Sequence, residues 1–220
     1  MRTFFLVAAT IITLATGTPC QHIISSWTVD DGLPQNAVYS ILQTRDGYLW
    51  FTTLDGLVRF DGMSFTIFSR SNTKGITSNR FNTLCEDGHG SLWIGTVAAG
   101  LFKFSDGRFT RFTLKDGLPD QYVTAIIEDR QGNLWIGTRA GLACLKRDCF
   151  IVYTTAEGFS GNDIASIFED REGNLWVGTY SRGLNRLTRT VVVVYGKRDG
   201  LSTDAFYPVF RIDFVVLATD

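Results

Sequence analysis

The side chains that most often carry chemistry are few in this chain and do not gather into a known pattern. The two histidines, His22 and His89, are 67 positions apart, and the four cysteines include no Cys-x-x-Cys pair. A zinc site is not expected, because zinc needs about four nitrogen or sulfur ligands held close together. Both histidines fall in segments predicted to lie at the surface, so no Ser-His-Asp arrangement stands out. The sequence therefore predicts no catalytic residue, no metal site and no cofactor.

Carboxylates are more numerous, but the sequence does not set any pair of them apart. The tract Asp129-x-x-Gly132-x-Leu134-Trp135 is similar to the Asp-box turns of sialidases, and it recurs along the chain. A glycosidase needs two carboxylates across one bond, whereas an Asp repeated with a turn favours hydrogen bonds to backbone amides. A calcium loop would need alternating Asp and Asn, which residues 170–173 do not supply. We expect these carboxylates to stabilise turns.

Length, composition and charge restrict the class of protein. With 220 residues, 45% of them hydrophobic, the chain can bury the core of one large or two small domains. Lys and Arg number 21 against 22 Asp and Glu, a formal net charge of -1, so no positive field favours nucleic acid as a partner. The 22 Gly, 17 Phe and only 4 Pro are typical of short strands joined by tight turns.

The first twenty residues have the order of a secretory signal peptide. A short positive start precedes an apolar run at residues 4–15 and a small, polar end. The run of 12 residues is shorter than the roughly 18 to 20 that span a bilayer, and cleavage after Gly17 is expected. We therefore predict an exported, periplasmic protein. A lipoprotein anchor at Cys20, which Pro19 disfavours, and an uncleaved N-terminal anchor are the alternatives.

One phrase is repeated four times after this segment. It reads GYLWFTT, GSLWIGT, GNLWIGT and GNLWVGT, with spacings of 43, 42 and 41 residues between the tryptophans. A Gly-Leu pair follows each tryptophan, and a Gly-containing turn phrase opens each unit. This agreement in register identifies an internal repeat. The repeated tryptophans are Trp50, Trp93, Trp135 and Trp176.

Each unit holds four predicted short strands rich in branched and aromatic residues. Those of the first unit are predicted at residues 38–43, 48–52, 57–60 and 65–68. Asp46-Gly47 and Asp61-Gly62 predict the hairpin turns. About 42 residues with four antiparallel strands predict a blade of a β-propeller, with a solenoid of strands as the alternative. The repeated Trp is expected to pack between neighbouring blades.

The predicted fold is all-β: a partial β-propeller with four complete four-stranded blades and the start of a fifth. Residues 1–20 are assigned to the signal peptide and 21–220 to the propeller. The blades are expected at about residues 31–70, 72–113, 115–155 and 156–196, with an incomplete fifth at 197–220.

The two ends of the repeat region carry separate predictions. Residues 24–29 match a fourth strand that lacks its first three, and residues 206–210 are the predicted first strand of the fifth unit. We expect the sequence to be part of a longer protein, or its end to have lost the repeat. Two open blade faces should then promote association or misfolding.

Three cysteines fall inside the repeats. Cys144 and Cys149 flank a hairpin turn of the third unit and are expected at diagonal positions. The sequence does not decide whether a disulfide joins them. Cys85 lies on a predicted first strand and is expected to be a small core residue.

The repeat resembles the two-component regulator propeller repeat. The resemblance covers roughly residues 24–210 and implies the exported sensor part of membrane histidine kinases and related bacterial signalling proteins. It implies a periplasmic ligand sensor, frequently of carbohydrate-derived signals, in a propeller that usually has seven blades. A kinase module is absent from this chain, so we predict no enzyme, and the missing blades or signalling domains as partners. The third unit shows the motif best, at Asp116–Pro119, Val123, Ile126, Glu128-Asp129, Gly132–Thr138 and Gly141-Leu142.

Ligand-binding residues are predicted where the repeats disagree. Four up-and-down strands place two loop sets on one face: those from strand four to the next strand one, and those from strand two to strand three. Amides, Arg and Tyr there suit hydrogen bonding and stacking with sugars or peptides, and solvated loop tips are the alternative. A glycan-active hydrolase or lyase and a protein-interaction propeller are the alternative functions. The candidates are Asn79, Arg80, Gln121, Tyr122, Asn162, Asp163, Arg139, Tyr180 and Arg182.

Overall fold

The structure, a computed structural model, describes residues 23–147, 149–188, 207–211 and 214–218. In these residues the strands form five antiparallel sheets, three with four strands, one with three and one with two. Within the same ranges, no helix has the length and apolar character needed to cross a membrane. The predicted signal peptide lies outside the described residues.

Each of the first four sheets is a meander in which consecutive strands are hydrogen-bonded neighbours. The first sheet contains β1 (Ser40–Gln43), β2 (Leu49–Thr52), β3 (Leu57–Phe60) and β4 (Phe65–Phe68). The second contains β5 (Phe81–Glu86), β6 (Leu92–Thr96), β7 (Leu101–Ser105) and β8 (Arg108–Phe112). The third contains β9 (Val123–Glu128), β10 (Leu134–Thr138), β11 (Gly141–Lys146) and β12 (Cys149–Tyr153). The fourth contains β13 (Ile164–Glu169), β14 (Leu175–Thr179) and β15 (Leu184–Leu187).

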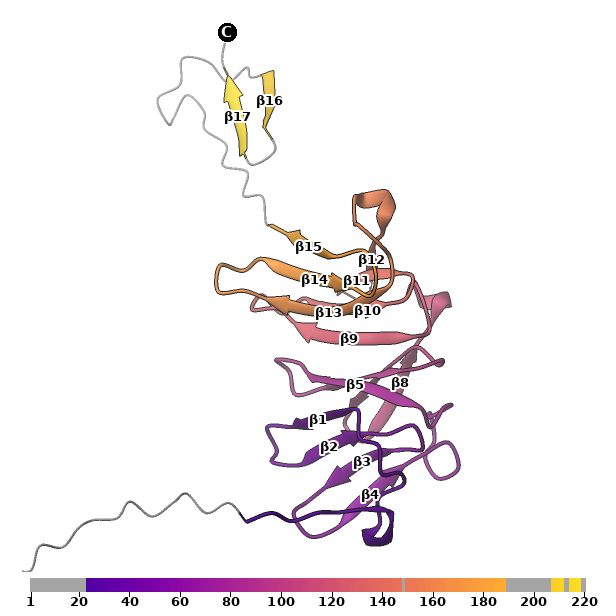
Figure 1. Cartoon of the computed structure of the whole chain (residues 1–220). Helices are drawn as coiled ribbons and strands as arrows, with labels where there is room; N and C mark the ends of the chain where they lie inside the picture. The colour runs from indigo at the N-terminus through magenta and orange to yellow at the C-terminus, as the bar shows by residue number, and fades with distance from the viewer. Residues whose placement is uncertain (1–22, 148, 189–206, 212–213, 219–220) are drawn as a thin grey trace, which may run out of the picture.

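The four sheets lie side by side in chain order, as the blades of a propeller do (Figure 1). The first strands of successive blades are in contact: β1 with β5, β5 with β9, and β9 with β13. The predicted all-β propeller fold is therefore confirmed. The four strands predicted for the first unit are also confirmed, although β1 begins two residues later than expected. The fourth strand expected for the fourth blade lies outside the described residues.

The repeated Asp-Gly pairs close hairpins, as predicted. Between β7 and β8, Asp106 and Gly107 both adopt positive φ angles, 51° and 73°. Tight hairpin turns of the primed types require positive φ, which Gly and Asp tolerate better than branched residues.

The turn phrase that opens the first, third and fourth units contains a short 3₁₀ turn. Each turn begins after a Thr, and the acidic residue three positions later completes a capping box with it. A Gly in the left-handed conformation follows each turn. The phrase therefore shapes the loop that enters each of these blades. The turns are η1 (Val29–Asp31), η2 (Leu114–Asp116) and η3 (Thr155–Glu157).

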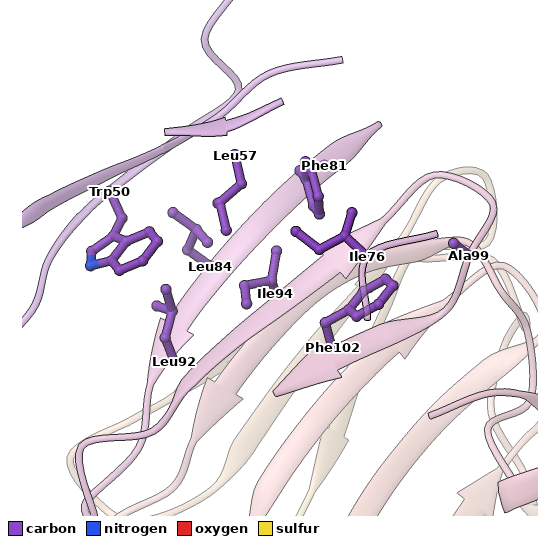
Figure 2. Close-up of a cluster of buried hydrophobic side chains, with 9 residues drawn as sticks. All are labelled: Trp50, Leu57, Ile76, Phe81, Leu84, Leu92, Ile94, Ala99 and Phe102. Atoms are coloured by element: carbon purple, nitrogen blue, oxygen red, sulfur yellow. The ribbon is translucent and has the colours of Figure 1, made fainter. Parts of the chain in front are cut away.

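The hydrophobic core lies between blades. Figure 2 shows the first cluster, in which Trp50 and Leu57 of the first blade pack with Leu84 and other apolar side chains of the second. A second cluster places Trp93 with side chains of the third blade, and a third places Trp135 with side chains of the fourth. The prediction that the repeated Trp packs between blades is confirmed for these three.

The Gly of the repeated Leu-Trp-x-Gly-Thr phrase lets neighbouring blades approach closely. A Cβ atom at Gly95 would lie 2.6 Å from methyl carbons of both Thr83 and Val123, the latter in the next blade. We predict that Gly95→Ala lowers the free energy of unfolding by about 1 to 3 kcal/mol, because overpacking displaces one of these neighbours. Chemical denaturation of the two proteins measures the difference.

Gly88→Ala is the control for this substitution. A Cβ atom there would meet only the flexible side chain of Glu128, at 3.4 Å. The free energy of unfolding is expected to fall less for Gly88→Ala than for Gly95→Ala. An equal fall for both variants would contradict the packing argument.

The two ends of the repeat region differ in structure from the blades between them. Residues 24–28 form no strand, so the prediction of a fourth strand at residues 24–29 is wrong. A strand needs a hydrogen-bonded neighbour, and no third strand pairs with this segment among the described residues. Trp27 still contacts Phe60, with ring centroids 5.8 Å apart. β16 (Tyr207–Arg211), which pairs with β17 (Phe214–Ala218), falls on the predicted first strand of the fifth unit.

Candidate functional site

Four of the nine candidate residues line one pocket where the third and fourth blades meet. Arg139 follows β10, and Arg182 lies in the corresponding loop after β14. Asn162 and Asp163 directly precede β13. The pocket has a volume of about 400 Å³, and Thr155, Ser160, Gly161, Thr179 and Ser181 complete its lining.

The repeated Thr fixes the two loops that carry the arginines. The hydroxyl of Thr138 donates to the carbonyl of Gly141 at 2.7 Å and accepts from the amide of Ala140 at 3.2 Å. The hydroxyl of Thr179 donates to a loop carbonyl at 2.9 Å and accepts from the amide of Arg182 at 2.9 Å. The arginine backbones are therefore held by groups that recur in every unit, while their side chains differ from unit to unit.

The side chain of Arg139 contacts a neighbouring aromatic ring. Its guanidinium lies over the ring of Tyr122, 3.9 Å from the ring centroid, in a cation–π contact. The amide of Tyr122 in turn donates to Asp120 at 2.9 Å. Tyr122 thus positions Arg139 beside the pocket without lining it.

Asp163 lines the pocket and has one carboxylate oxygen without a partner. One of its carboxylate oxygens, Oδ1, is buried and has no hydrogen-bond partner among the described residues. A buried acceptor without a donor costs free energy, so Asp163 carries an unsatisfied oxygen at the wall of the pocket. The backbone of Asp163 is fixed, because its carbonyl accepts from the amide of Tyr180 at 3.0 Å.

The pocket has a positive balance of charge. Arg139 and Arg182 face one carboxylate, that of Asp163. In the part of the chain that the structure describes, the ion pairs join Arg45 to Glu86 and Arg130 to Glu169 and do not involve the pocket arginines. Both guanidinium groups therefore retain donors for an anionic group.

Two candidates have a structural role that sequence reasoning missed. The carboxamide oxygen of Asn162 accepts from the amide of Thr155 at 2.8 Å, and that of Asn79 accepts from Arg70, also at 2.8 Å. Asn36 makes the same bond to a backbone amide in the first unit. The recurrence of Asn at one repeat position is the signal that marks this role.

The remaining candidates do not reach the pocket. Gln121 accepts from Arg111 at 3.4 Å and helps to hold the loops of the second and third blades together. Arg80 is exposed, and its carbonyl accepts from the amide of Val97 in its own blade. Tyr180 is exposed beside the pocket. The structure thus brings one candidate of the third blade and three of the fourth to the pocket, and leaves both candidates of the second blade apart.

The repeated Asp residues stabilise turns, as predicted. Asp87 accepts from the amides of His89 and Ser91 and, at 2.8 Å, from the indole nitrogen of Trp93. Burial alone would raise the pKa of Asp87, but the bonds from Trp93 and the amides lower it below its ordinary value. Asp129 and Asp170 make the same bond to Trp135 and Trp176.

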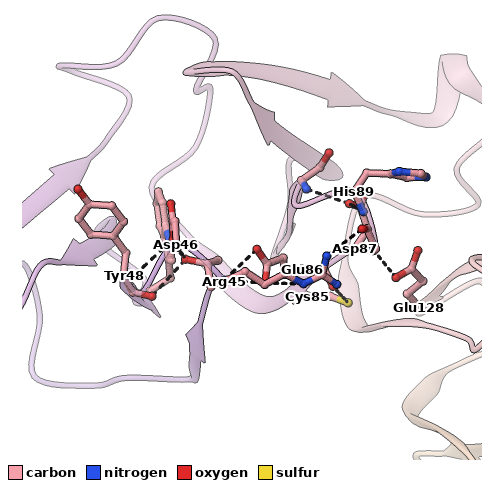
Figure 3. A network of polar contacts seen from close by, with 12 residues as sticks. Arg45, Asp46, Tyr48, Cys85, Glu86, Asp87, His89 and Glu128 are labelled. Carbon is pink, nitrogen blue, oxygen red and sulfur yellow. Dashed lines mark hydrogen bonds and ion pairs between the residues drawn. The ribbon is translucent and has the colours of Figure 1, made fainter.

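A second set of acids joins neighbouring blades by hydrogen bonds close to these Asp turns, and we call this arrangement the polar clamp (Figure 3). Glu86 of the second blade accepts from the amide of Arg45 in the first at 3.1 Å, while Arg45 donates to the carbonyl of Gly88 at 2.8 Å. Glu128 of the third blade accepts from the amide of Gly88. These carboxylates are thus engaged by the scaffold. No group of three or more metal-ligating side chains occurs in the described residues.

The cysteines also have structural positions. In the ladder of β11 and β12, Cys144 faces Ile151 and Cys149 faces Lys146, so the predicted diagonal arrangement is confirmed. No disulfide joins Cys144, which is buried, to Cys149, which is exposed. Cys85 packs in the second core cluster, and burial raises its pKa to about 11. Its thiol is a core group, as predicted.

Comparison with known proteins identifies the repeat. Residues 32–55, 75–98, 117–140 and 158–181 match the family described as "Two component regulator propeller". The chain carries four two component regulator propeller repeats. Each matched segment runs from the opening turn phrase through the second strand of a blade.

The relatives found are signalling proteins and other propellers. A stretch of 56 residues, 26% of this chain, is 45% identical to "Histidine kinase P4" of Formosa agariphila and covers 4% of it. The extracellular domain of the putative hybrid two component system BT3049 of B. thetaiotaomicron is 27% identical, with a TM-score of 0.66 over 73% of this chain and 23% of that one. A streptogramin B lyase, 21% identical over 70% of this chain and 55% of the lyase, has a TM-score of 0.53 and shares the fold alone. The chain spans less than two thirds of each of these proteins.

The two component regulator propeller repeats explain which parts of the candidate site are scaffold. Thr138, Thr179 and the turn Asp residues lie inside matched segments and recur in register. Arg139 and Tyr180 also lie inside matched segments, but at a position where every unit has a different residue. The site therefore consists of variable side chains on a repeated backbone.

Proposed function

We propose that this chain is the ligand-sensing module of an exported two-component signalling protein. One observation carries the proposal: variable polar side chains of two successive repeats converge on one pocket, with Arg139, Asp163 and Arg182 on its wall. The similarity to an extracellular domain of a hybrid two component system supports a sensor role. The signal-peptide pattern in residues 1–20 supports a periplasmic location. The module binds and reports, and it carries out no reaction.

The chemistry of the pocket favours a small hydroxylated anion. Arg139 and Arg182 can donate paired hydrogen bonds to a carboxylate, and the carboxylate of Asp163, which lines the pocket, can accept from a hydroxyl. A pocket of about 400 Å³ admits a ligand of the size of a monosaccharide. A sugar acid such as a hexuronate has both groups.

Isothermal titration of the full chain with hexuronates and the matching neutral hexoses tests this function. We predict binding of a sugar acid, and a loss of affinity of about tenfold or more for Arg139→Ala and Arg182→Ala, because each removes a charge-assisted bond of about 1.5 kcal/mol or more. The control is Arg80→Ala, an exposed arginine of the same face outside the pocket. A panel without any binder, or an equal loss for Arg80→Ala, would contradict the proposal.

A further inference from the structure

The loop that carries Arg182 packs directly on a glycine in the segment before β13. A Cβ atom at Gly161 would lie 2.6 Å from the Cγ atom of Arg182 and 2.7 Å from its Cβ atom. Non-bonded carbon atoms pack at about 3.5 to 4 Å, and the Cβ atom of Arg182 moves only with its backbone. No rotamer of the arginine could therefore make room for a side chain at position 161. Gly161 is buried and lines the pocket together with Arg182.

Hydrogen bonds hold the chain on both sides of this contact. The amide of Arg182 donates to the hydroxyl of Thr179 at 2.9 Å, which fixes the arginine loop. The amide of Ser160 donates to the carboxamide oxygen of Asn185 on β15 at 2.8 Å, which fixes the segment that leads to Gly161. Neither segment can move away from the other without straining one of these bonds. A side chain at position 161 would therefore displace the loop that carries the arginine.

The other units have a hydrogen-bonding side chain at the repeat position of Gly161. In the first unit, Gln35 accepts from the amide of Leu54 in the loop between β2 and β3 at 2.8 Å. In the second and third units, Ser78 and Asp120 accept from backbone amides two positions later, at 3.1 and 2.9 Å. In the fourth unit a direct packing contact with the arginine stands in place of such a bond.

The second unit shows the same loop without an arginine. Its loop between β6 and β7 has the same length, and the amide of Ala99 donates to the hydroxyl of Thr96 at 2.9 Å, as that of Arg182 donates to Thr179. Ala99 is buried in the first core cluster. Among the four units, only the fourth combines the glycine with an arginine at this loop position.

We infer that Gly161 is a positioning residue of the pocket, which sets the place of Arg182 on the pocket wall for the anionic group of the ligand. The inference rests on the proposed function, because the place of Arg182 affects binding only if the pocket holds an anion. Gly161 does not have a positive φ angle. Its backbone therefore suits alanine, and the packing contact with Arg182 is what the glycine permits.

Isothermal titration of the full chain with a hexuronate tests the inference through Gly161→Ala. The added methyl group displaces the arginine loop, so the affinity should fall about tenfold, as expected for Arg182→Ala. In a chain that carries Arg182→Gly, Gly161→Ala should cause no further loss, because the Cβ and Cγ atoms that it would meet are gone.

Gly178→Ala is the matched control in the same blade. A Cβ atom at Gly178 would also meet a neighbour at 2.7 Å, the hydroxyl of Ser166. Gly178 has no positive φ angle either, and neither it nor Ser166 lines the pocket. This variant should bind the hexuronate as the wild-type protein does, whatever its effect on stability.

A second measurement needs no ligand. The Nε–Hε signal of Arg182 in a proton–nitrogen correlation NMR spectrum can be identified as the signal that Arg182→Ala lacks. It should shift in Gly161→Ala and keep its position in Gly178→Ala, because only the first substitution moves the arginine.

The outcomes separate this inference from the proposed function. Wild-type binding that weakens with Arg182→Ala but not with Gly161→Ala would overturn the inference alone. A loss for Gly161→Ala that persists in the Arg182→Gly chain would also overturn it, because the glycine would then act without the arginine. A chain that binds no sugar acid would contradict the proposed function. The NMR signal would then decide on Gly161, and an Arg182 signal that does not shift would overturn its positioning role.

Discussion

Replacement of Trp93 by alanine is expected to lower the free energy of unfolding by about 3 to 5 kcal/mol, the range for a buried aromatic side chain. Trp93 is buried in the cluster that joins the second and third blades, with Leu118 and Val123 among its neighbours. Its ring also contacts Phe112, with centroids 5.6 Å apart. The substitution opens a cavity between two blades and removes the indole that donates to Asp87. Equilibrium unfolding in urea measures the loss.

Trp176→Ala is the matched control within the same chain. Trp176 has the same place in the repeat and the same bond to an Asp, at 2.7 Å, but its side chain is only half-buried. The expected loss is therefore clearly smaller, since less apolar surface returns to water. Equal losses for the two substitutions would show that the tryptophan stabilises its own turn rather than the contact between blades.

The fold could be predicted because the repeat encodes it locally. Each blade is built from short strands with their own turn residues, so Asp61-Gly62 predicts a hairpin whatever the rest of the chain does. The recurrence of Trp at fixed spacing predicts in addition that each blade packs its apolar face on a neighbouring blade, which the sequence of a single unit cannot indicate. The strand predicted at residues 24–29 was wrong because its partner strand would belong to another blade.

The candidate site was predicted only in part. The variable loop positions include Arg139, Asp163 and Arg182, which line the pocket; side chains that differ between repeats are not needed by the scaffold, and a ligand role for these three stays a prediction. The role of Asn162 was missed, since its partner is a backbone amide seven positions away, and residue types do not reveal such bonds. The hydrogen bond from a backbone amide to Glu86 was not predicted for the same reason, because that amide lies 41 positions away in another blade.

Replacement of Asp129 by alanine is expected to lower the free energy of unfolding by about 2 to 3 kcal/mol, the cost of buried donors left without an acceptor. Asp129 accepts from the indole of Trp135 at 2.9 Å and from the amides of Gln131 and Asn133, both at 2.9 Å. All these donors lose their acceptor at once. Urea denaturation at neutral pH measures the loss.

Asp129→Thr is the conservative variant, because the repeat itself provides the precedent. The first unit has Thr44 at this position, and its hydroxyl accepts from the indole of Trp50 at 3.2 Å. Threonine should therefore restore part of the stability that alanine loses. A threonine variant as unstable as the alanine variant would show that the charge of the carboxylate, rather than an acceptor for the indole, is what the turn requires.

The pH dependence of stability tests the contribution of the Asp129 charge, because Asp129→Thr keeps a hydrogen-bond acceptor but removes the carboxylate. Burial would raise the pKa of Asp129, but the bonds from Asn133, Trp135 and the amides lower it below 3.8, and the same balance brings Asp170 to about 2. A carboxyl with a lower pKa in the folded state stabilises the fold above its ordinary pKa and loses this effect as the pH falls through its folded value. Wild-type stability should thus fall between about pH 4 and pH 2, and Asp129→Thr should fall less steeply over the same window. Equal slopes for the two proteins would mean that Asp129 is not among the carboxylates that make this propeller sensitive to acid.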